Sequence, residues 1–320
     1  MKVLHIIDAS NHVYRGASVP RPFYYGQELI NGELQSKSVL HGGFTALLDY
    51  IPMLEKSYFF DPEIENYYAI CFDSRTKTHK KIENPTYKAN RKYDPETCAH
   101  AQMEYAEAVL KEYGYVVCRE EGYEADDVAY SLWKKYGKDY SLVVLHSTDK
   151  DWSFMINDDT VQFAKRKIQG QQKYEYRIID PTSYTLEFKV QYNLMLFNKV
   201  LKGDTSDGVK GVGMKWFDNI KEIVVDKGLS PASFGDVRTV RDVLLAVGER
   251  NPNFPVNDAM SVLDLVTPEL INVDRYAYEL FDSRPKKLPI NYILTTRPQT
   301  RSDVHKDLFY DFVERCRSER

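Results

Sequence analysis

The chain has 320 residues, enough for one large domain or two ordinary ones, and 43% hydrophobic with 28% charged residues is an ordinary globular composition. No repeat period or low-complexity tract stands out, which argues against solenoid and disordered classes. The 43 basic and 47 acidic residues give a net charge of −4, which argues only weakly against a polyanionic partner.

The four cysteines have neither C-x-x-C spacing nor the density of a disulfide framework, which is typical of a reducing compartment. The first residues do not form a secretory signal, and no stretch approaches about eighteen apolar residues. We therefore expect a cytoplasmic protein with no membrane span.

The first part of the chain begins with a short apolar run, Val3–Ile7, that predicts a strand buried on both faces. Residues 16–37 are punctuated by Gly and Pro and predict a loop, and apolar residues at helical spacing then predict a crossover helix over 38–58. A second strand is expected at Tyr67–Phe72. The following segment, 74–94, is rich in Lys and Arg and predicts a basic loop.

The middle of the chain repeats the order of helix and strand. Asp94–Pro95 is a typical helix start, and one apolar face continues toward Gly114. We expect a third strand at Tyr115–Cys118, a helix at Glu124–Tyr136 and a fourth strand at Ser141–His146. This alternation predicts an α/β fold class, in which right-handed crossovers join the strands of a parallel sheet with flanking helices.

The last part of the chain predicts a hairpin at the sheet edge, between residues 161 and 179, and then a helical region. Within that region a Gly-rich loop over 203–213 separates two helices. We therefore expect a core over residues 1–180 and a helical region over 181–320.

Acidic residues follow the predicted strands or open the helix after one of them. They are Asp8, Asp73, Glu124, Asp126, Asp127, Asp149 and Asp151. The carboxyl ends of parallel strands meet at one edge of a sheet, so these side chains are expected to converge. Crowded carboxylates cannot all stay ionised and unpaired, and hard ions such as Mg²⁺ or Mn²⁺ prefer oxygen ligands. Because one Mg²⁺ needs fewer carboxylates, we expect two ions.

Ordinary structural roles are the alternative for these residues. Asp and Glu are favoured at helix starts, and an Asp after a strand is often a turn or cap residue. On an ideal helix Glu124 and Asp127 share a face while Asp126 points away. The residue pattern alone therefore favours Glu124 and Asp127 as a pair.

The basic segment 74–94 interleaves cations with the rings of Tyr87 and Tyr93. Its cations are Arg75, Lys77, Lys80, Lys81, Lys88, Arg91 and Lys92. Such a pattern is typical of a strap that follows a phosphate backbone and stacks on unpaired bases. The alternative is a solvated surface loop.

The Gly-rich loop has Gly208, Gly211 and Gly213, which leave the backbone free to approach a ligand. Gly213 lies at the start of a helix, whose amides can hold a phosphate. Asp204 and Asp207 precede these glycines and extend the acidic set.

Six short blocks, in this order, resemble the 5′-nuclease superfamily of flap endonucleases and 5′-3′ exonucleases, most closely its bacterial polymerase-associated and phage-type members. The blocks are Ile7–Asn11 with Tyr14–Arg15, Phe72–Asp73, Tyr87–Arg91, Glu124–Asp127, Ser147–Asp151 and Gly203–Gly213. The chain departs from the pattern in the length of segment 16–37, in Lys150 where Gly is usual, and after about residue 230.

The resemblance implies a PIN-like parallel-sheet core with a helical arch formed by the basic segment at about 74–95. It also implies a helix-three-turn-helix element at about 195–225 that grips duplex DNA.

The resemblance also implies roles for single residues. Asp8, Asp73, Glu124 and Asp126 would hold one metal ion, Asp149, Asp151 and Asp207 the other, and Asp127 and Asp204 would support them. Lys88 and Arg91 would contact the scissile phosphate and stabilise developing charge. The expected DNA contacts are Arg75, Lys77, Lys80, Lys81, Tyr87, Lys92, Lys210, Gly211, Gly213 and Lys215, and the expected K⁺ site lies at Val209 and Val212.

The function implied is that of a Mg²⁺- or Mn²⁺-dependent, structure-specific 5′ nuclease acting on flap or 5′-ended DNA, and on RNA primers, in replication or repair. We expect a monomer whose partners are DNA, RNA–DNA hybrid and replication proteins, in a bacterial or phage-infected cytoplasm. One alternative is a DNA-binding or scaffold protein of this fold without catalysis. Another is a Mg²⁺ phosphatase with Asp8 as nucleophile, although Ser10 stands where that chemistry usually has a second Asp.

Overall fold

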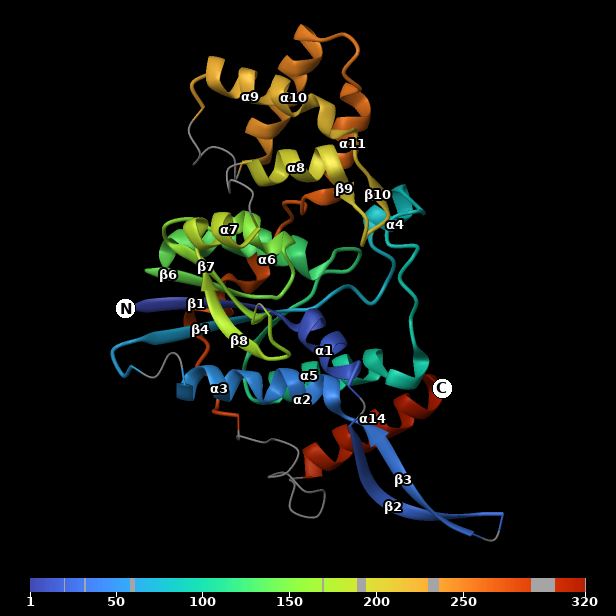
Figure 1. Cartoon of the computed structure of the whole chain (residues 1–320). Coiled ribbons are helices and arrows are strands. Elements are labelled where there is room, and N and C mark those ends of the chain that lie inside the picture. The colour runs from blue at the N-terminus through green and yellow to red at the C-terminus, as the bar shows by residue number, and fades with distance from the viewer. Residues whose placement is uncertain are drawn as a thin grey trace. The chain divides into compact units, whose positions relative to one another are not determined.

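The computed structural model of the chain describes residues 1–19, 21–31, 33–57, 61–168, 170–188, 194–229, 236–288 and 303–319 (Figure 1). By its contacts the chain forms two compact units. The first unit comprises residues 1–73, 93–119 and 273–320, and the second comprises 74–92 and 120–272. The boundary expected near residue 180 divides the sequence differently and stays a prediction. No helix among the described residues is long and apolar enough to cross a membrane.

The first unit contains three parallel strands, β1 (Lys2–Asp8), β4 (Glu65–Cys71) and β5 (Val116–Cys118). β4 lies between the other two, with Asp8 opposite Cys71 and Cys71 opposite Cys118. The strands are buried apolar runs, as expected of a parallel sheet. The predicted α/β class with a parallel sheet is confirmed, and the ends of β1 and β4 bring Asp8 and Asp73 to the same edge.

Helices cover this sheet in the first unit. α1 (Ala9–Ala17) begins where β1 ends, with Asp8 as its N-cap, and packs on α2 (Gly42–Leu48) and α5 (Ala99–Glu112). The remaining elements are α3 (Tyr50–Ser57), the 3₁₀ turns η1 (Pro95–Thr97) and η7 (Asp274–Tyr276), α12 (Ala277–Asp282) and α14 (Asp303–Glu319).

The single helix expected over 38–58 is wrong, because the segment forms the end of a strand and then two helices, α2 and α3. Pro52 lies in the first turn of α3 and has no N–H to donate to Leu48, so an uninterrupted helix would lose a hydrogen bond there.

The loop expected over 16–37 is also wrong. β2 (Pro22–Ile30) and β3 (Glu33–Leu40) form an antiparallel ribbon that projects from α14 (Figure 1). The Asn31–Gly32 dipeptide is a strong hairpin signal that the Gly and Pro punctuation obscured. At the base of the ribbon Phe23 packs edge-on against Phe309 of α14, with ring centroids 5.6 Å apart.

The second unit contains β6 (Leu142–His146), parallel to β7 (Thr160–Lys167), and β8 (Tyr174–Ile179), antiparallel to β7. The predicted fourth strand and the hairpin are therefore confirmed. α6 (Ala125–Tyr136) matches the predicted helix, with Glu124 as its N-cap.

The helical part of the second unit also contains a small hairpin. Its helices are α7 (Pro181–Phe188), α8 (Met195–Lys202), α9 (Phe217–Asp226), α10 (Val237–Arg250) and α11 (Val256–Val266). Between α8 and α9 the chain forms β9 (Gly203–Asp204), β10 (Val209–Lys210) and the 3₁₀ turn η5 (Met214–Trp216). Two further 3₁₀ turns are η2 (Gly137–Asp139) and η3 (Asp151–Met155).

The segment 74–95, expected to form a helical arch, contains the α-helix α4 (His79–Glu83), which is followed by turns. Pro85 forces the preceding Asn84 out of the helical region, to φ −127° and ψ 93°, which ends α4.

Close packing of α1 on α2 depends on Gly16. A Cβ atom at this position would lie 2.3 Å from the carbonyl oxygen of Gly42 and 2.6 Å from Cβ of Ala46. We expect Gly16→Ala to lower the free energy of unfolding by about 2 kcal/mol, because overpacking a tight contact forces backbone shifts. Chemical denaturation followed by circular dichroism measures this. Gly137→Ala, whose Cβ would lie at an ordinary contact distance of 3.4 Å from Cδ1 of Trp133, is the control. An equal effect of both changes would contradict the packing argument.

Candidate metal centre and phosphate contacts

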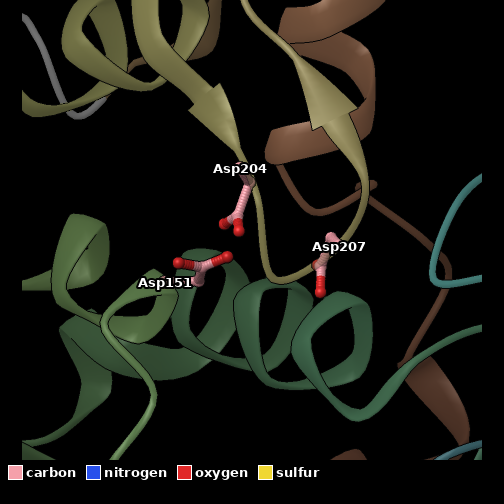
Figure 2. A group of neighbouring side chains, drawn as sticks. All are labelled: Asp151, Asp204 and Asp207. Atoms are coloured by element: carbon pink, nitrogen blue, oxygen red, sulfur yellow. The ribbon is translucent and has the colours of Figure 1, made fainter. Parts of the chain in front are cut away.

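Three carboxylates of the second unit, those of Asp151, Asp204 and Asp207, form a compact group (Figure 2). One oxygen from each lies within 4.8 Å of the others. Asp151 opens η3 just beyond β6, and the other two belong to the loop from β9 to β10. A set of carboxylate oxygens suits a hard divalent ion, so this group can hold Mg²⁺ or Mn²⁺.

Lys199 of α8 balances part of this negative charge. Its ammonium group forms an ion pair with Asp151 and lies 3.3 Å from Oδ2 of Asp204. Lys199 was not among the residues expected from the sequence, in which the available signal was a lysine five residues before Asp204. Burial alone would lower the pKa of Lys199, but Asp151 and Asp204 raise it above its usual value, so the amine stays charged.

The pKa of the Asp151 carboxyl is raised from 3.8 to about 6. Burial is the main cause, the ammonium group of Lys199 opposes it, and the charge of Asp149 reinforces it. Without a bound ion this carboxyl therefore takes up a proton at a pH where most acidic side chains are ionised.

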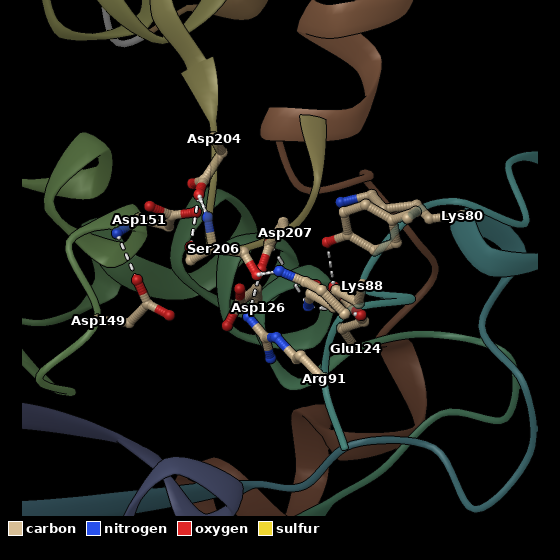
Figure 3. Close-up of polar contacts among 12 residues, drawn as sticks. Lys80, Lys88, Arg91, Glu124, Asp126, Asp149, Asp151, Asp204, Ser206 and Asp207 are labelled. Atoms are coloured by element: carbon tan, nitrogen blue, oxygen red, sulfur yellow. Dashed lines mark hydrogen bonds and ion pairs between the residues drawn. The ribbon is translucent and has the colours of Figure 1, made fainter. Parts of the chain in front are cut away.

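A second centre joins the basic segment to the start of α6 (Figure 3). Nζ of Lys88 lies 2.7 Å from Oε1 of Glu124 and 4.0 Å from Oδ2 of Asp207. Tyr87 donates its hydroxyl to the other oxygen of Glu124 at 3.0 Å, and Arg91 pairs with Asp207. The two predicted phosphate-binding cations thus contact carboxylates from two separate parts of the site.

The charge states of this centre follow from its contacts. Burial would lower the pKa of Lys88, but Glu124, followed by Asp126 and Asp207, raises it above its usual value. Burial would raise the pKa of Glu124, but Lys88 and then Lys80 hold it below its usual range. Both partners are therefore ionised at neutral pH.

An ideal helix suggested that Asp127 lies on the same face as Glu124 and that Asp126 points away, but the contacts of these two aspartates differ from that expectation. Asp126 accepts a hydrogen bond of 2.6 Å from Nε1 of Trp152, and its charge acts on Lys88. Asp127 is 2% exposed, and its oxygens accept the backbone N–H groups of Glu124 and Glu269, each at 2.8 Å. The expectation that Asp127 serves the metal is corrected, because both of its oxygens are committed to backbone groups.

Asp149 lies outside the three-carboxylate group. One of its carboxylate oxygens accepts the backbone N–H of Asp151 at 3.0 Å, which orients the turn that follows β6. The resemblance grouped Asp149 with Asp151 and Asp207, whereas the third member of the compact group is Asp204.

Asp8 and Asp73 belong to the first unit. Asp8 accepts the N–H of Asn11 at 3.0 Å, and Ser10 accepts the N–H of Asp73 at 2.9 Å. Arg119, which the sequence analysis missed, donates to the carbonyl oxygen of Asp73 and forms an ion pair of 2.6 Å with Glu107. Asp73 is therefore held by contacts to its backbone.

The predicted DNA contacts divide into exposed and buried side chains. The exposed ones are Arg75, Lys77, Lys81, Lys92, Lys210 and Lys215. Lys80 and Tyr87 are 7% and 4% exposed and are bound to groups of their own unit, which corrects the expectation that they contact DNA.

The predicted glycines also differ from one another. A Cβ at Gly211 would lie 2.3 Å from the backbone nitrogen of Gly203, so this glycine serves packing within the loop. Gly213 has φ +105°, and no atom lies within 4 Å of the place where its Cβ would be. The K⁺ site expected at Val209 and Val212 stays a prediction.

Comparison with known proteins agrees with this picture. A family model of the 5′-3′ exonuclease N-terminal resolvase-like domain matches residues 3–188. DNA polymerase I of Treponema pallidum is 30% identical over 223 residues, which cover 67% of this chain and 20% of the relative. A 5′-3′ exonuclease of Aquifex aeolicus is 25% identical over 220 residues, which cover 69% of each protein.

A crystal structure of the bacteriophage T5 flap endonuclease with DNA and metal ions is 20% identical, with a TM-score of 0.54, and covers 98% of this chain and 99% of that one. This likeness shows that the fold is shared. The chain spans about a fifth of the length of the DNA polymerase I relatives that it matches.

A group of carboxylates with adjoining Lys and Arg side chains can bind a divalent ion and a phosphate group. The family match covers more than half of the 320 residues. The chain belongs to the 5′-3′ exonuclease family, as its six sequence blocks predicted.

Protonation of Asp151 is expected to control metal binding. We expect the affinity for Mn²⁺ to fall as the pH drops below about 6, because the carboxyl must lose its proton before it can bind an ion. Electron paramagnetic resonance titrations between about pH 5 and pH 8 measure this affinity. Asp151→Asn should bind Mn²⁺ more weakly and with a flatter pH dependence, and identical pH profiles for the two proteins would contradict the assignment.

Proposed function

We propose that the chain is a divalent-metal-dependent 5′ nuclease that hydrolyses phosphodiester bonds at flaps or 5′ ends of DNA. The observation that carries this proposal is the contact of Lys88 and Arg91 with Glu124 and Asp207, next to a carboxylate group suited to Mg²⁺ or Mn²⁺. Membership of the 5′-3′ exonuclease family supports it.

We propose two metal ions. Asp151, Asp204 and Asp207 would hold one, and Glu124 and Asp126 would contribute to the other, for which the family resemblance also implies Asp8 and Asp73. In such sites the ions supply an activated water and stabilise the leaving oxygen. Asp149 would orient Asp151, and Asp127 would hold the start of α6.

Lys88 would bind the scissile phosphate. At neutral pH its ammonium group is charged and rests on Glu124. If Glu124 serves as a metal ligand, as proposed, its charge would no longer hold Lys88, and the ammonium group would be available to a phosphate oxygen. Arg91 would act in parallel if Asp207 serves as a ligand, because a guanidinium fits two phosphate oxygens.

The exposed cations would bind the DNA backbone. Arg75, Lys77, Lys81 and Lys92 lie on the basic segment, Lys210 lies in the Gly-rich loop, and Lys215 follows that loop. We propose that the element over 195–225 grips duplex DNA, with K⁺ at the carbonyls of Val209 and Val212. We also propose that the protein is a monomer that acts in the cytoplasm. Its substrates would be replication or repair intermediates, including RNA primers, and it would bind replication proteins.

The alternatives explain less of the site. A scaffold protein has no need of a buried Lys88–Glu124 pair, with an Arg91–Asp207 pair next to it, beside a metal-binding group, since buried charges are costly. In the phosphatase alternative, the residue two places after Asp8 would take part in the chemistry, but Ser10 is buried and its hydroxyl oxygen accepts the N–H of Asp73.

Cleavage of a labelled panel of flap, nicked, gapped and RNA-primed duplexes tests the proposal. We expect cleavage of flap and 5′-ended substrates that leaves 5′-phosphate products and stops when a chelator removes the metal. DNA binding without cleavage in Mg²⁺ or Mn²⁺ would favour the scaffold. Hydrolysis of a small phosphomonoester, with no cleavage of DNA, would favour the phosphatase.

Replacement of Lys88 tests its role directly. We expect Lys88→Ala to lower the single-turnover rate by about 100-fold, a loss typical of removing one group that stabilises developing charge. Duplex affinity should change by less than about threefold, because many other cations contact the backbone. Lys138→Ala removes an exposed cation of the same unit as a control. Equal single-turnover rates for wild type and Lys88→Ala would remove Lys88 from the chemistry.

A further inference from the structure

Lys80 is a cation of the basic segment that does not face solvent. It lies on α4, is 7% exposed, and donates a hydrogen bond of 2.8 Å from Nζ to the carbonyl oxygen of Thr267 (Figure 3). The same ammonium group lies 3.6 Å from Oδ1 of Asp127. Its surroundings are therefore a carboxylate and a carbonyl, which together compensate the cost of burying its charge.

Asp127 connects three segments of the second unit. Oδ2 accepts the N–H of Glu124, Oδ1 accepts the N–H of Glu269, and Lys80 supplies the opposite charge. Ser131, one turn further along α6, donates to the carbonyl of Asp127 and accepts the N–H of Ile271. The start of α6 is thus tied to residues 267–271 through one buried carboxylate.

Glu124 is the residue whose position depends on this connection. Its backbone N–H donates to the carboxylate of Asp127. The residue is 6% exposed, and its own carboxylate faces Lys88 and Tyr87. If Lys80 were neutral, the charge of Asp127 would be left without this counter-ion in a site that is 2% exposed. Removing one partner of a buried ion pair strongly destabilises the charge that is left, so Asp127 would hold Glu124 less firmly.

We propose that Lys80 is a positioning residue for the metal site, acting through Asp127 to fix Glu124 at the start of α6. This inference rests on the proposed function, in which Glu124 is a metal ligand. Groups that orient metal ligands from behind commonly change metal affinity by about 10- to 100-fold when they are removed. The cation is therefore expected to matter for metal binding and not for contact with DNA.

Mn²⁺ titration by electron paramagnetic resonance, without DNA, tests this proposal. We expect Lys80→Met and Lys80→Gln to weaken Mn²⁺ binding about tenfold, because neither side chain carries a charge for Asp127. Lys80→Arg keeps the charge and a donor, and should bind Mn²⁺ within about threefold of wild type. Lys138→Met, which removes an exposed cation of the same unit, should bind like wild type.

Cleavage and stability measurements separate positioning from a purely structural role. In flap cleavage by Lys80→Gln we expect the Mn²⁺ concentration for half-maximal rate to rise about tenfold, with the rate recovering at saturating Mn²⁺. If Lys80→Met does not fold, Lys80→Gln decides, since it can still donate to Thr267. A folded Lys80→Gln protein with wild-type Mn²⁺ affinity overturns the proposal, even if its unfolding midpoint is lower. Wild-type protein that binds no Mn²⁺ and cleaves no DNA would instead overturn the proposed function itself.

Discussion

Repulsion among crowded carboxylates is the constraint on which the rest of this structure depends. The second unit brings Asp151, Asp204 and Asp207 close together, and the charges of Glu124 and Asp207 both act on Lys88. Like charges at short range disfavour ionisation, as the raised pKa of Asp151 shows. Cations from two segments balance these carboxylates. α8 provides Lys199, while the basic segment provides Lys88 and Arg91. The fold of this unit therefore places cations where they stabilise its clustered carboxylates.

The same balance suggests how binding and chemistry are linked. In the proposed site, metal ions and internal cations would serve the same carboxylates, so the cations paired with these carboxylates would become available to a phosphate when the carboxylates act as metal ligands. Lys88 is suited to this exchange because its side chain is mostly buried but its partner, Glu124, is a proposed metal ligand. Lys80 differs, since its partner Asp127 is committed to backbone groups and its charge stays in place. Lys88 would change its partner during the reaction, whereas Lys80 would stay paired with Asp127 and keep the start of α6 in place.

Local sequence patterns predicted many of the strands and helices and part of the candidate metal site. Buried apolar runs located the strands, and Asp8 and Asp73 were expected at their ends, because periodicity and strand direction are properties of short segments. The β2–β3 ribbon was missed because Gly and Pro punctuation outweighed its Asn-Gly turn signal. What the sequence could not supply was which charges are buried. Lys80 has the same local pattern as its exposed neighbours, and its contact with Thr267 comes from 187 residues further along the chain. The contact between Asp127 and Glu269, 142 residues further along the chain, likewise distinguishes Asp127 from the adjacent Asp126.

The central claim is that the three-carboxylate group is a metal site, and crystals soaked in Mn²⁺ test it most directly. Anomalous difference maps should show a peak about 2.0–2.5 Å from carboxylate oxygens of Asp151, Asp204 and Asp207, a distance expected for oxygen ligands of such ions. Lys199 should then no longer pair with Asp151. Absence of a peak at saturating Mn²⁺, with the Lys199–Asp151 ion pair intact, would contradict the account.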